Sequence, residues 1–284
     1  MSHVHIKEGI AKALFVAAAG ISVLAVALIC VFLFANGVPA IAQIGLPEFL
    51  FGTTGRPAND IYGIFPMIVG SIYVTAGAIV VGVPTGLLCA IFLSRFASGK
   101  IAAVLKPGVE LLAGIPSVVY GFFGLVVMVP FIRTNMPGNG LSLLAASVLL
   151  GIMILPTIIT VAQSALDAVP KKYYEGALAL GADHECSVFR VIVPAATSGI
   201  MAGVVLGVGR AIGETMAVIM VAGNQAVMPR GIFKGVRTLT ANIVLEMGYA
   251  AGLHREALIA TAVVLFFFIL IINMIFMIAK RSEQ

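Results

Sequence analysis

The order of apolar and polar residues divides the chain into long hydrophobic runs separated by shorter polar connections. The runs cover residues 13–35, 63–94, 101–132, 141–165, 195–222 and 256–279. A helix crosses the hydrocarbon of a bilayer with about 20 apolar residues, so each run is long enough for one span. The pattern therefore predicts an all-α polytopic membrane protein with six transmembrane helices.

Prolines and glycines predict where two of these spans depart from straight helices. Residues 101–132 contain Pro107, Pro116 and Pro130, and proline removes a helix hydrogen bond. We predict a break at or near Ile115-Pro116-Ser117, which would turn the hydroxyls of Ser117 and Tyr120 toward the interior. Helix packing and anchoring at the interface explain the same residues equally well.

Glycines in the second run, together with the two long polar connections, predict further local features. Gly82 and Gly86 predict a close-packing face, and Pro84 predicts a kink. Residues 36–62 are expected to form a loop with a short segment at LPEFLF. Residues 223–255 are expected to hold a short helix at 238–247.

Composition supports the membrane assignment and limits what else the chain holds. Hydrophobic residues make up 61% of it, charged residues 10%, and the mean hydropathy is +1.12. A soluble domain has about 25% charged residues. Residues 13–35 exceed the roughly 7–15 apolar residues of a signal peptide core, so we expect a retained span. We expect an N-terminal segment at 1–62 and a transmembrane core at 63–280.

The candidate chemistry lies in the fifth run, where Arg210 and Glu214 are the only charged residues between 195 and 222. Charges at that depth each cost roughly 2.5–3.5 kcal/mol on insertion scales and usually face a bundle interior or a wet cavity. On a continuous helix Gly203, Gly207, Arg210 and Glu214 share one face, which predicts a helix that lines a path for a charged solute. The alternative is a structural brace in which Arg210 pairs with Glu214, although the order Arg before Glu is the less favourable one.

The distribution of cations predicts the orientation. With six spans, ten cations fall on the side of the termini: Lys7, Lys12, Arg95, Lys100, Lys106, Lys171, Lys172, Arg190, Lys280 and Arg281. Six fall on the other side: Arg56, Arg133, Arg230, Lys234, Arg237 and Arg255. Because cytoplasmic loops carry more Lys and Arg, both termini are predicted to be cytoplasmic. The local excess at 230–255 is either a surface for an anionic solute or an acidic partner, or a plain solvated loop.

The polar connection at 167–194 predicts a rigid elbow between the fourth and fifth spans. Pro170 suits the first turn of a helix, Gly181 suits its end, and Asp183 suits the cap of a second helix. We therefore expect a helix–turn–helix on the cytoplasmic face, and such a unit suits docking by a soluble partner. The scattered cysteines and the absence of histidine from the apolar runs predict no metal site.

This elbow resembles the coupling motif of ABC importer permeases. That motif is E-A-A-x-x-x-G, nine residues, then I-x-L-P. Here Glu175-Gly176-Ala177 precedes Gly181, and Val191-Ile192-Val193-Pro194 follows after nine residues. Glu175, Ala177, Gly181 and Pro194 match, whereas Gly176, Val191 and Val193 are small or apolar replacements.

Two further stretches, residues 111–121 and 209–218, resemble the permeases of the phosphate importer. Met216-Ala217-Val218 after Gly-Glu-Thr is similar to the PstC type, and the likeness covers roughly residues 63–280. It implies a type I ABC importer permease fold in a bacterial or archaeal cytoplasmic membrane, with alternating access driven by ATP. It implies as partners a PstA-type permease subunit, an ATPase dimer and an extracytoplasmic phosphate-binding protein.

If phosphate is the solute, Arg210 is suited to it because a guanidinium grips two oxygens and stays charged. Glu214 would temper the attraction and accept from a protonated phosphate, and Thr215 and Ser117 are further candidates. The chain contains no G-x-x-x-x-G-K-[ST] sequence, so we expect a transport subunit without cofactor and with ATP bound by a partner.

Other functions remain open from the residues alone. These are a permease for another oxyanion such as molybdate or phosphonate, a proton- or sodium-driven secondary transporter, an intramembrane enzyme, and a role in signalling phosphate supply. Against the enzyme, the sequence contains neither H-E-x-x-H nor G-x-S-x-G.

Overall fold

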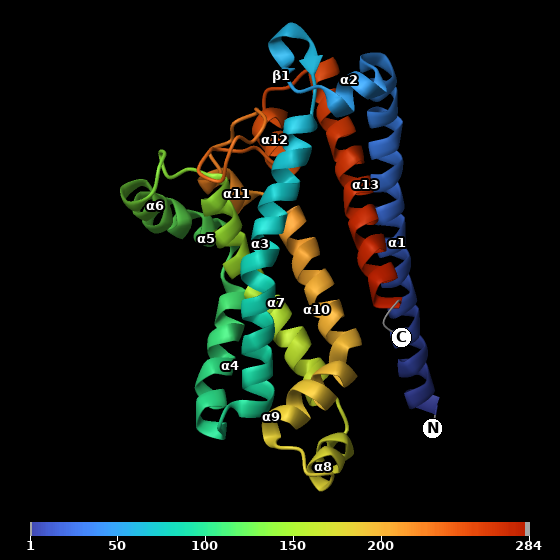
Figure 1. Cartoon of the computed structure of the whole chain (residues 1–284). Coiled ribbons are helices and arrows are strands. Elements are labelled where there is room, and N and C mark those ends of the chain that lie inside the picture. Colours follow the sequence, from blue (N-terminus) through green and yellow to red (C-terminus); the bar gives the residue numbers. More distant parts are fainter. Residues whose placement is uncertain (1, 282–284) are drawn as a thin grey trace.

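A computed structural model describes residues 2–281 of the chain (Figure 1). The side chains of four of the counted cations, Lys7, Arg56, Lys280 and Arg281, lie outside its described part. The N-terminal part comprises α1 (Ser2–Ile44), α2 (Leu46–Phe51), the antiparallel strands β1 (Gly55–Arg56) and β2 (Ile61–Tyr62) with a 3-10 turn η1 (Pro57–Asn59) between them, α3 (Phe65–Ile91) and the π-helical turn η2 (Phe92–Phe96).

The remaining elements include a series of helices interrupted by two more π-helical turns, η3 and η4. They are α4 (Gly99–Gly114), α5 (Ser117–Phe123), η3 (Gly124–Met128), α6 (Val129–Asn135), α7 (Leu143–Asp167), α8 (Lys171–Ala179), α9 (His184–Ser187), η4 (Val188–Ile192), α10 (Val193–Gly213), α11 (Met216–Val221), α12 (Leu239–Met247) and α13 (Leu253–Arg281).

The prediction of six spans is confirmed, because six helical segments are long and apolar enough to cross a bilayer. They cover Ala11–Ile44, Phe65–Phe96, Ser117–Asn135, Leu143–Asp167, His184–Gly213 and Leu253–Ile275. The first helix continues to Ile44 through Pro39, so the expected loop at 36–62 begins later than predicted. The short segment expected at LPEFLF is a helix, α2, and the short helix predicted at 238–247 is confirmed as α12.

The third span differs from the single kinked helix expected at 101–132. The chain breaks at Ile115 and Pro116, as predicted, and both residues are extended. Proline disfavours helical geometry in the residue before it, which explains why the helix ends there. The two halves are separate helices, and α4 carries the charged residues Lys106 and Glu110.

Helix α7 is the centre of the bundle and packs against α3 on one side and α10 on another (Figure 1). Glycines bring α3 close. A Cβ atom on Gly82 would lie 2.6 Å from Ile154 Cγ1, and one on Gly86 would lie 2.9 Å from Ile158 Cγ2. The close-packing face predicted from Gly82 and Gly86 is therefore confirmed.

The bundle has two different ends (Figure 1). The elbow formed by α8 and α9 lies at one end, and the strands, α2 and α12 lie at the other. Helix α1 pairs with α13 at the side of the bundle, where the Phe34 ring meets the rings of Phe266 and Phe267. The beginning of α1 and the end of α13 both point toward the end that carries the elbow.

Candidate anion path and coupling surface

Two glycines of α10 set its distance from α7 in the middle of the bundle. A Cβ atom on Gly207 would lie 2.8 Å from Ile158 Cγ1, and one on Gly203 would lie 3.2 Å from Val161 Cβ. The first distance is shorter than real side chains tolerate, so glycine at 207 is required for this contact. These glycines therefore let α7 and α10 approach each other closely.

Arg210 lies in the last turn of α10 and is half-buried. Its Nη1 donates to Thr157 Oγ1 of α7 at 3.3 Å, and its positive charge interacts with the Tyr120 hydroxyl of α5. Among residues 2–281, Thr157 is the one hydrogen-bond partner of this side chain, and no acid pairs with it. A guanidinium held this way keeps further N–H donors for a ligand.

Glu214 does not share a helical face with Arg210, which corrects the prediction of one continuous helix from 195 to 222. Helix α10 ends at Gly213, and Glu214 is extended, with φ −69° and ψ 132°. Its Oε1 accepts from the N–H groups of Thr215 at 3.0 Å and Ala217 at 3.2 Å. The carboxylate thus satisfies donors at the start of α11, whereas glycine at 213 weakens the helix before it.

The same break rules out the structural brace. Within the described chain, no ion pair joins Arg210 to Glu214. The backbone oxygen of Glu214 accepts from Thr240 Oγ1 of α12 at 3.1 Å, which fixes the break against the outer part of the bundle. Each of the two charges therefore has its own surroundings, as the unfavourable residue order suggested.

The two weaker candidates have different positions. The hydroxyl of Thr215 donates to Gly213 O at 3.3 Å within the turn that follows α10. Ser117 is the first residue of α5 and is half-buried. The structure places both at helix starts, and it brings neither into hydrogen-bond contact with Arg210.

The hydroxyl of Tyr120 has a partner that the sequence did not indicate. It donates to the Leu112 carbonyl at 2.8 Å, across the break between α4 and α5. Carbonyls in the last turn of a helix lack regular helix partners, and in the described chain Leu112 O otherwise accepts only a long bond of 3.4 Å from Ile115 N. The Tyr120 hydroxyl therefore supplies its shorter hydrogen bond. Thr157 was not among the candidates predicted from the sequence either. The feature that could have indicated it is a hydroxyl next to Pro156 in a mostly apolar run.

The elbow has the predicted helix–turn–helix form. Helix α8 ends before Gly181, whose φ of +87° suits glycine, and Ala182 N donates back to Ala177 O at 3.1 Å. The Asp183 carboxylate caps α9 by accepting from Cys186 N at 2.7 Å. The Tyr174 hydroxyl and His184 Nδ1, 2.8 Å apart, join the two helices.

The residues that match the coupling motif lie on accessible parts of this elbow. Glu175 and Gly176 are exposed, Ala177 is half-buried, and Gly181 has open space where a side chain would begin. Pro194 is in the first turn of α10, beneath the elbow. Pro194 is exposed as well, so four of the five residues, all but Ala177, are accessible parts of one structural unit.

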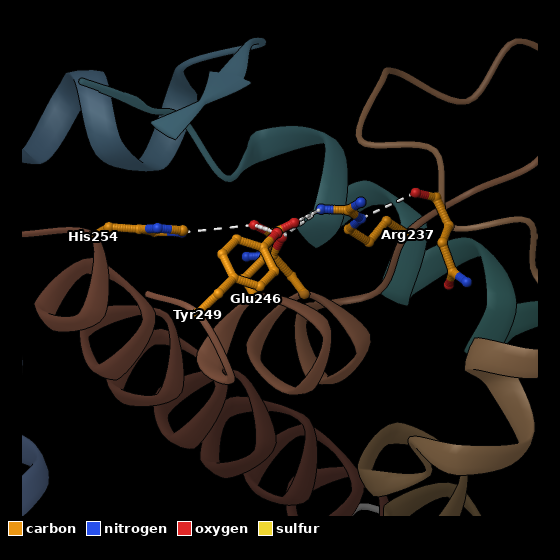
Figure 2. A network of polar contacts seen from close by, with 6 residues as sticks. Arg237, Glu246, Tyr249 and His254 are labelled. Carbon is orange, nitrogen blue, oxygen red and sulfur yellow. Dashed lines mark hydrogen bonds and ion pairs between the residues drawn. The ribbon is translucent and has the colours of Figure 1, made fainter. Parts of the chain in front are cut away.

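At the opposite end, the expected cationic surface at 230–255 is partly neutralised. Figure 2 shows Arg237 pointing toward Glu246, and its Nη1 lies 2.8 Å from Glu246 Oε1. On its other side Nε donates to Asn224 O at 3.0 Å. Tyr249 donates its hydroxyl to Glu246, and His254 Nε2 lies 3.7 Å from the same carboxylate (Figure 2). Arg237 is half-buried and its charge is paired, so it braces the outer loop against α12.

This brace borders a cavity of about 200 Å³ beneath the β-hairpin. Tyr62 of β2 and Met67 of α3 line it together with polar side chains of the brace. The pKa of Tyr62 is raised by burial and by the hydrogen bond to Asp60, 2.9 Å long. Among residues 2–281, no three His, Cys, Asp or Glu side chains gather to hold a metal ion.

Comparisons with known proteins identify the family. The sequence pattern of the binding-protein-dependent transport system inner membrane components matches residues 82–282. A probable ABC transporter permease protein of Bacillus subtilis, YqgH, is 41% identical over 86% of this chain and 83% of its own length. The phosphate transport system permease protein PstC of Mesorhizobium japonicum is 34% identical over 84% of this chain and 79% of its own length.

A solved structure has the same fold. It is a bacterial ABC transporter involved in the import of the acidic polysaccharide alginate, and it matches with a TM-score of 0.63 at 12% identity. The match covers 94% of this chain and 95% of that one. The chain therefore belongs to the family of binding-protein-dependent transport system inner membrane components.

Proposed function

We propose that the chain is the permease subunit through which an ATP-driven importer moves inorganic phosphate across the cytoplasmic membrane. One observation carries this: Arg210, half-buried at mid-bundle, has a hydroxyl partner and, in the described part of the chain, no acidic one. An unpaired guanidinium suits an oxyanion because its planar N–H groups bind two oxygens at once. The names of relatives such as PstC of Mesorhizobium japonicum support phosphate as that oxyanion.

The roles of the other residues follow from their positions. Arg210 binds the anion, and Ser117 and Thr215 are candidates for further contacts at the adjoining helix starts. Glu214 acts mainly by holding the start of α11, so its tempering effect on the anion is weaker than the sequence alone predicted. The chain needs no cofactor of its own, since ATP is bound by the partner subunits.

The elbow is proposed as the docking site of an ATPase dimer, with Glu175 and Gly176 at the contact. A PstA-type permease completes the membrane part, and an extracytoplasmic phosphate-binding protein delivers the anion. The end that bears α2, α12 and the β-hairpin then faces outward. The elbow and both termini face the cytoplasm, as the cation count predicts.

The experiment for the anion path uses the assembled complex in proteoliposomes and radiolabelled phosphate. Arg210→Gln removes the charge, and we expect uptake to fall roughly ten- to hundredfold, the value of a lost charge-assisted hydrogen bond. Arg210→Lys is expected to recover part of the uptake. Lys234→Gln, in the exposed outer loop, is the control with an equal loss of charge.

Near-wild-type phosphate uptake by Arg210→Gln would end the proposed role of this residue. Competition tests the identity of the anion. If an excess of molybdate or phosphonate suppresses uptake of radiolabelled phosphate more strongly than the same excess of unlabelled phosphate does, the path belongs to another oxyanion. Uptake that persists without ATP while an ion gradient is intact would favour a secondary transporter.

Docking is tested separately by copurification. Glu175→Lys reverses an exposed charge on α8, and Gly181→Asp places a side chain at a positive φ in the turn. We expect both to reduce recovery of the ATPase with the permease and to uncouple transport. Lys12→Glu on α1 is the control for charge reversal. Full recovery of the ATPase and normal transport in both variants would contradict docking at the elbow.

A further inference from the structure

The elbow half of α7 has a polar side and an apolar side. Taking 3.6 residues per turn, its polar residues fall within an arc of about 120°: Thr157, Thr160, Gln163, Ser164 and Asp167. The other side is buried through Ile159, Ala162 and Leu166. The polar side is half-buried or exposed. At membrane depth, contact of such a surface with lipid tails is costly, because polar groups there lack partners.

A cavity of about 270 Å³ lies on this polar side, between α7 and α4. From α7 it is lined by residues 160, 163, 164 and 167, and from α4 by the charged side chains of Lys106 and Glu110. Both of these charges are exposed on the chain and stand one helical turn apart. Polar and charged groups from two helices therefore face one water-accessible space in the half of the bundle nearest the elbow.

The polar side of α7 links this cavity to the surroundings of Arg210. Thr157 accepts the hydrogen bond of Arg210, and Thr160 follows one turn later, about 4.5 Å along the helix axis. At the far end Asp167 accepts from Ser94 at 2.5 Å, and Arg95 donates to the Leu166 carbonyl. The polar side thus leads without interruption from the guanidinium to the base of the elbow.

We propose that the polar side of α7, with Lys106 and Glu110 of α4, forms a water-filled exit segment that takes a hydrated oxyanion from Arg210 to the elbow end. This inference rests on the proposed function and adds the second half of the path. Lys106 attracts the anion into the segment. Glu110 and Asp167 balance that charge, so the anion passes through hydrated and is not trapped.

Accessibility of single cysteines tests whether the segment holds water. Cys30, Cys89 and Cys186 are first replaced by serine in the full complex, in inside-out membrane vesicles. Cysteine is then placed at Thr160 or Ser164, and reaction with the anionic reagent sulfonatoethyl methanethiosulfonate is timed. The controls are Ala162→Cys on the buried side of α7 and Val104→Cys on the apolar side of α4, which is 73% exposed on the chain.

We expect cysteines at 160 and 164 to react at least tenfold faster than those at 162 and 104. A second measurement tests the charge. With cysteine at 160, the reaction rate of the anionic reagent is divided by that of a cationic trimethylammonium methanethiosulfonate reagent. Lys106→Gln should lower this ratio by roughly fivefold, which is the effect of a nearby unit charge in water. Equal rates at all four positions, or a ratio that Lys106→Gln leaves unchanged, would overturn the exit segment.

Phosphate uptake measured in the same complex separates the two ideas. If phosphate is imported through Arg210 while positions 160 and 164 are sealed, the exit segment alone is wrong. If these positions react as expected but uptake is selective for another oxyanion, the exit segment holds and the assignment of phosphate fails. Lys106→Gln should also reduce uptake by several fold, with recovery in Lys106→Arg.

Discussion

The carboxylate of Glu214 has a structural role that a pair of substitutions can isolate. Its Oε1 accepts from Thr215 N at 3.0 Å and Ala217 N at 3.2 Å, two donors at the start of α11 that have no partner within that helix. Glu214→Gln keeps a side-chain oxygen at the same distance from the backbone. Glu214→Ala removes the acceptor altogether.

The magnitude follows from these two bonds. A buried donor left without a partner costs about 1–3 kcal/mol, and Glu214 is half-buried, so the lower part of that range applies to each N–H. Glu214→Ala should therefore lower the free energy of unfolding by about 2–3 kcal/mol. Glu214→Gln should cost about 1 kcal/mol, because hydrogen bonds to a charged acceptor are roughly twice as strong as neutral ones.

Thermal unfolding of the purified complex in detergent measures the difference, at about 2–4 °C for each kcal/mol in a chain of this size. Phosphate uptake by Glu214→Gln is measured in parallel and should remain within a few fold of wild type. Equal stability of the Ala variant and the wild type would refute the capping role. If Glu214→Gln is stable but inactive, the negative charge of Glu214 is needed for phosphate transport and its role is more than structural.

Further predictions concern the turn of the elbow, a helix contact and the outer brace. Gly181→Ala should lower the free energy of unfolding by about 1 kcal/mol because of its φ of +87°, whereas Gly176→Ala inside α8 should raise it slightly, both by thermal unfolding. Gly82→Leu should prevent assembly of α3 on α7, seen as loss of monodisperse complex in gel filtration, because a Cβ there already lies 2.8 Å from the Gly151 carbonyl. The hydrogen bond to Glu246, followed by burial, raises the pKa of Tyr249 above its ordinary value of 10.0. The stability that the protonated Tyr249 hydroxyl contributes is therefore fully present below pH 10.0 and is lost as the pH rises through the pKa of the folded state. Tyr249→Phe should remove that alkaline loss in unfolding curves taken from pH 9 to about 11.

Features that depend on local chemistry could be predicted from the sequence. The break at Pro116 follows from the ring of proline, and the turn at Gly181 follows from the freedom of glycine to take a positive φ. The contacts at Gly82 and Gly207 follow from small residues at helical spacing, although their partners on α7 do not. In each case the residue type alone determines the local backbone geometry or the closeness of the helix contact, without information from distant residues.

The break at Glu214 could not be predicted this way. No proline marks it, and the apolar run continues on both sides, so the hydropathy pattern favours one helix. The break is stabilised by the Glu214 side chain, which accepts from N–H groups at the start of α11. It is also stabilised by Thr240, 26 residues away, which donates to the Glu214 carbonyl. The pairing of Arg237 with Glu246 likewise joins a loop to α12, and a count of cations in that loop could not reveal it.

The break also explains why two charges four residues apart do not pair. Arg210 lies in the last turn of α10, where the partial negative charge of the helix end favours a cation. Glu214 lies at the start of α11, where free N–H groups favour an anion, and it is bound to two of them. Each charge thus complements a different helix end, which lowers the cost of holding both at membrane depth. Because the carboxylate is already engaged, an anion on the proposed path would meet the guanidinium without displacing an ion pair.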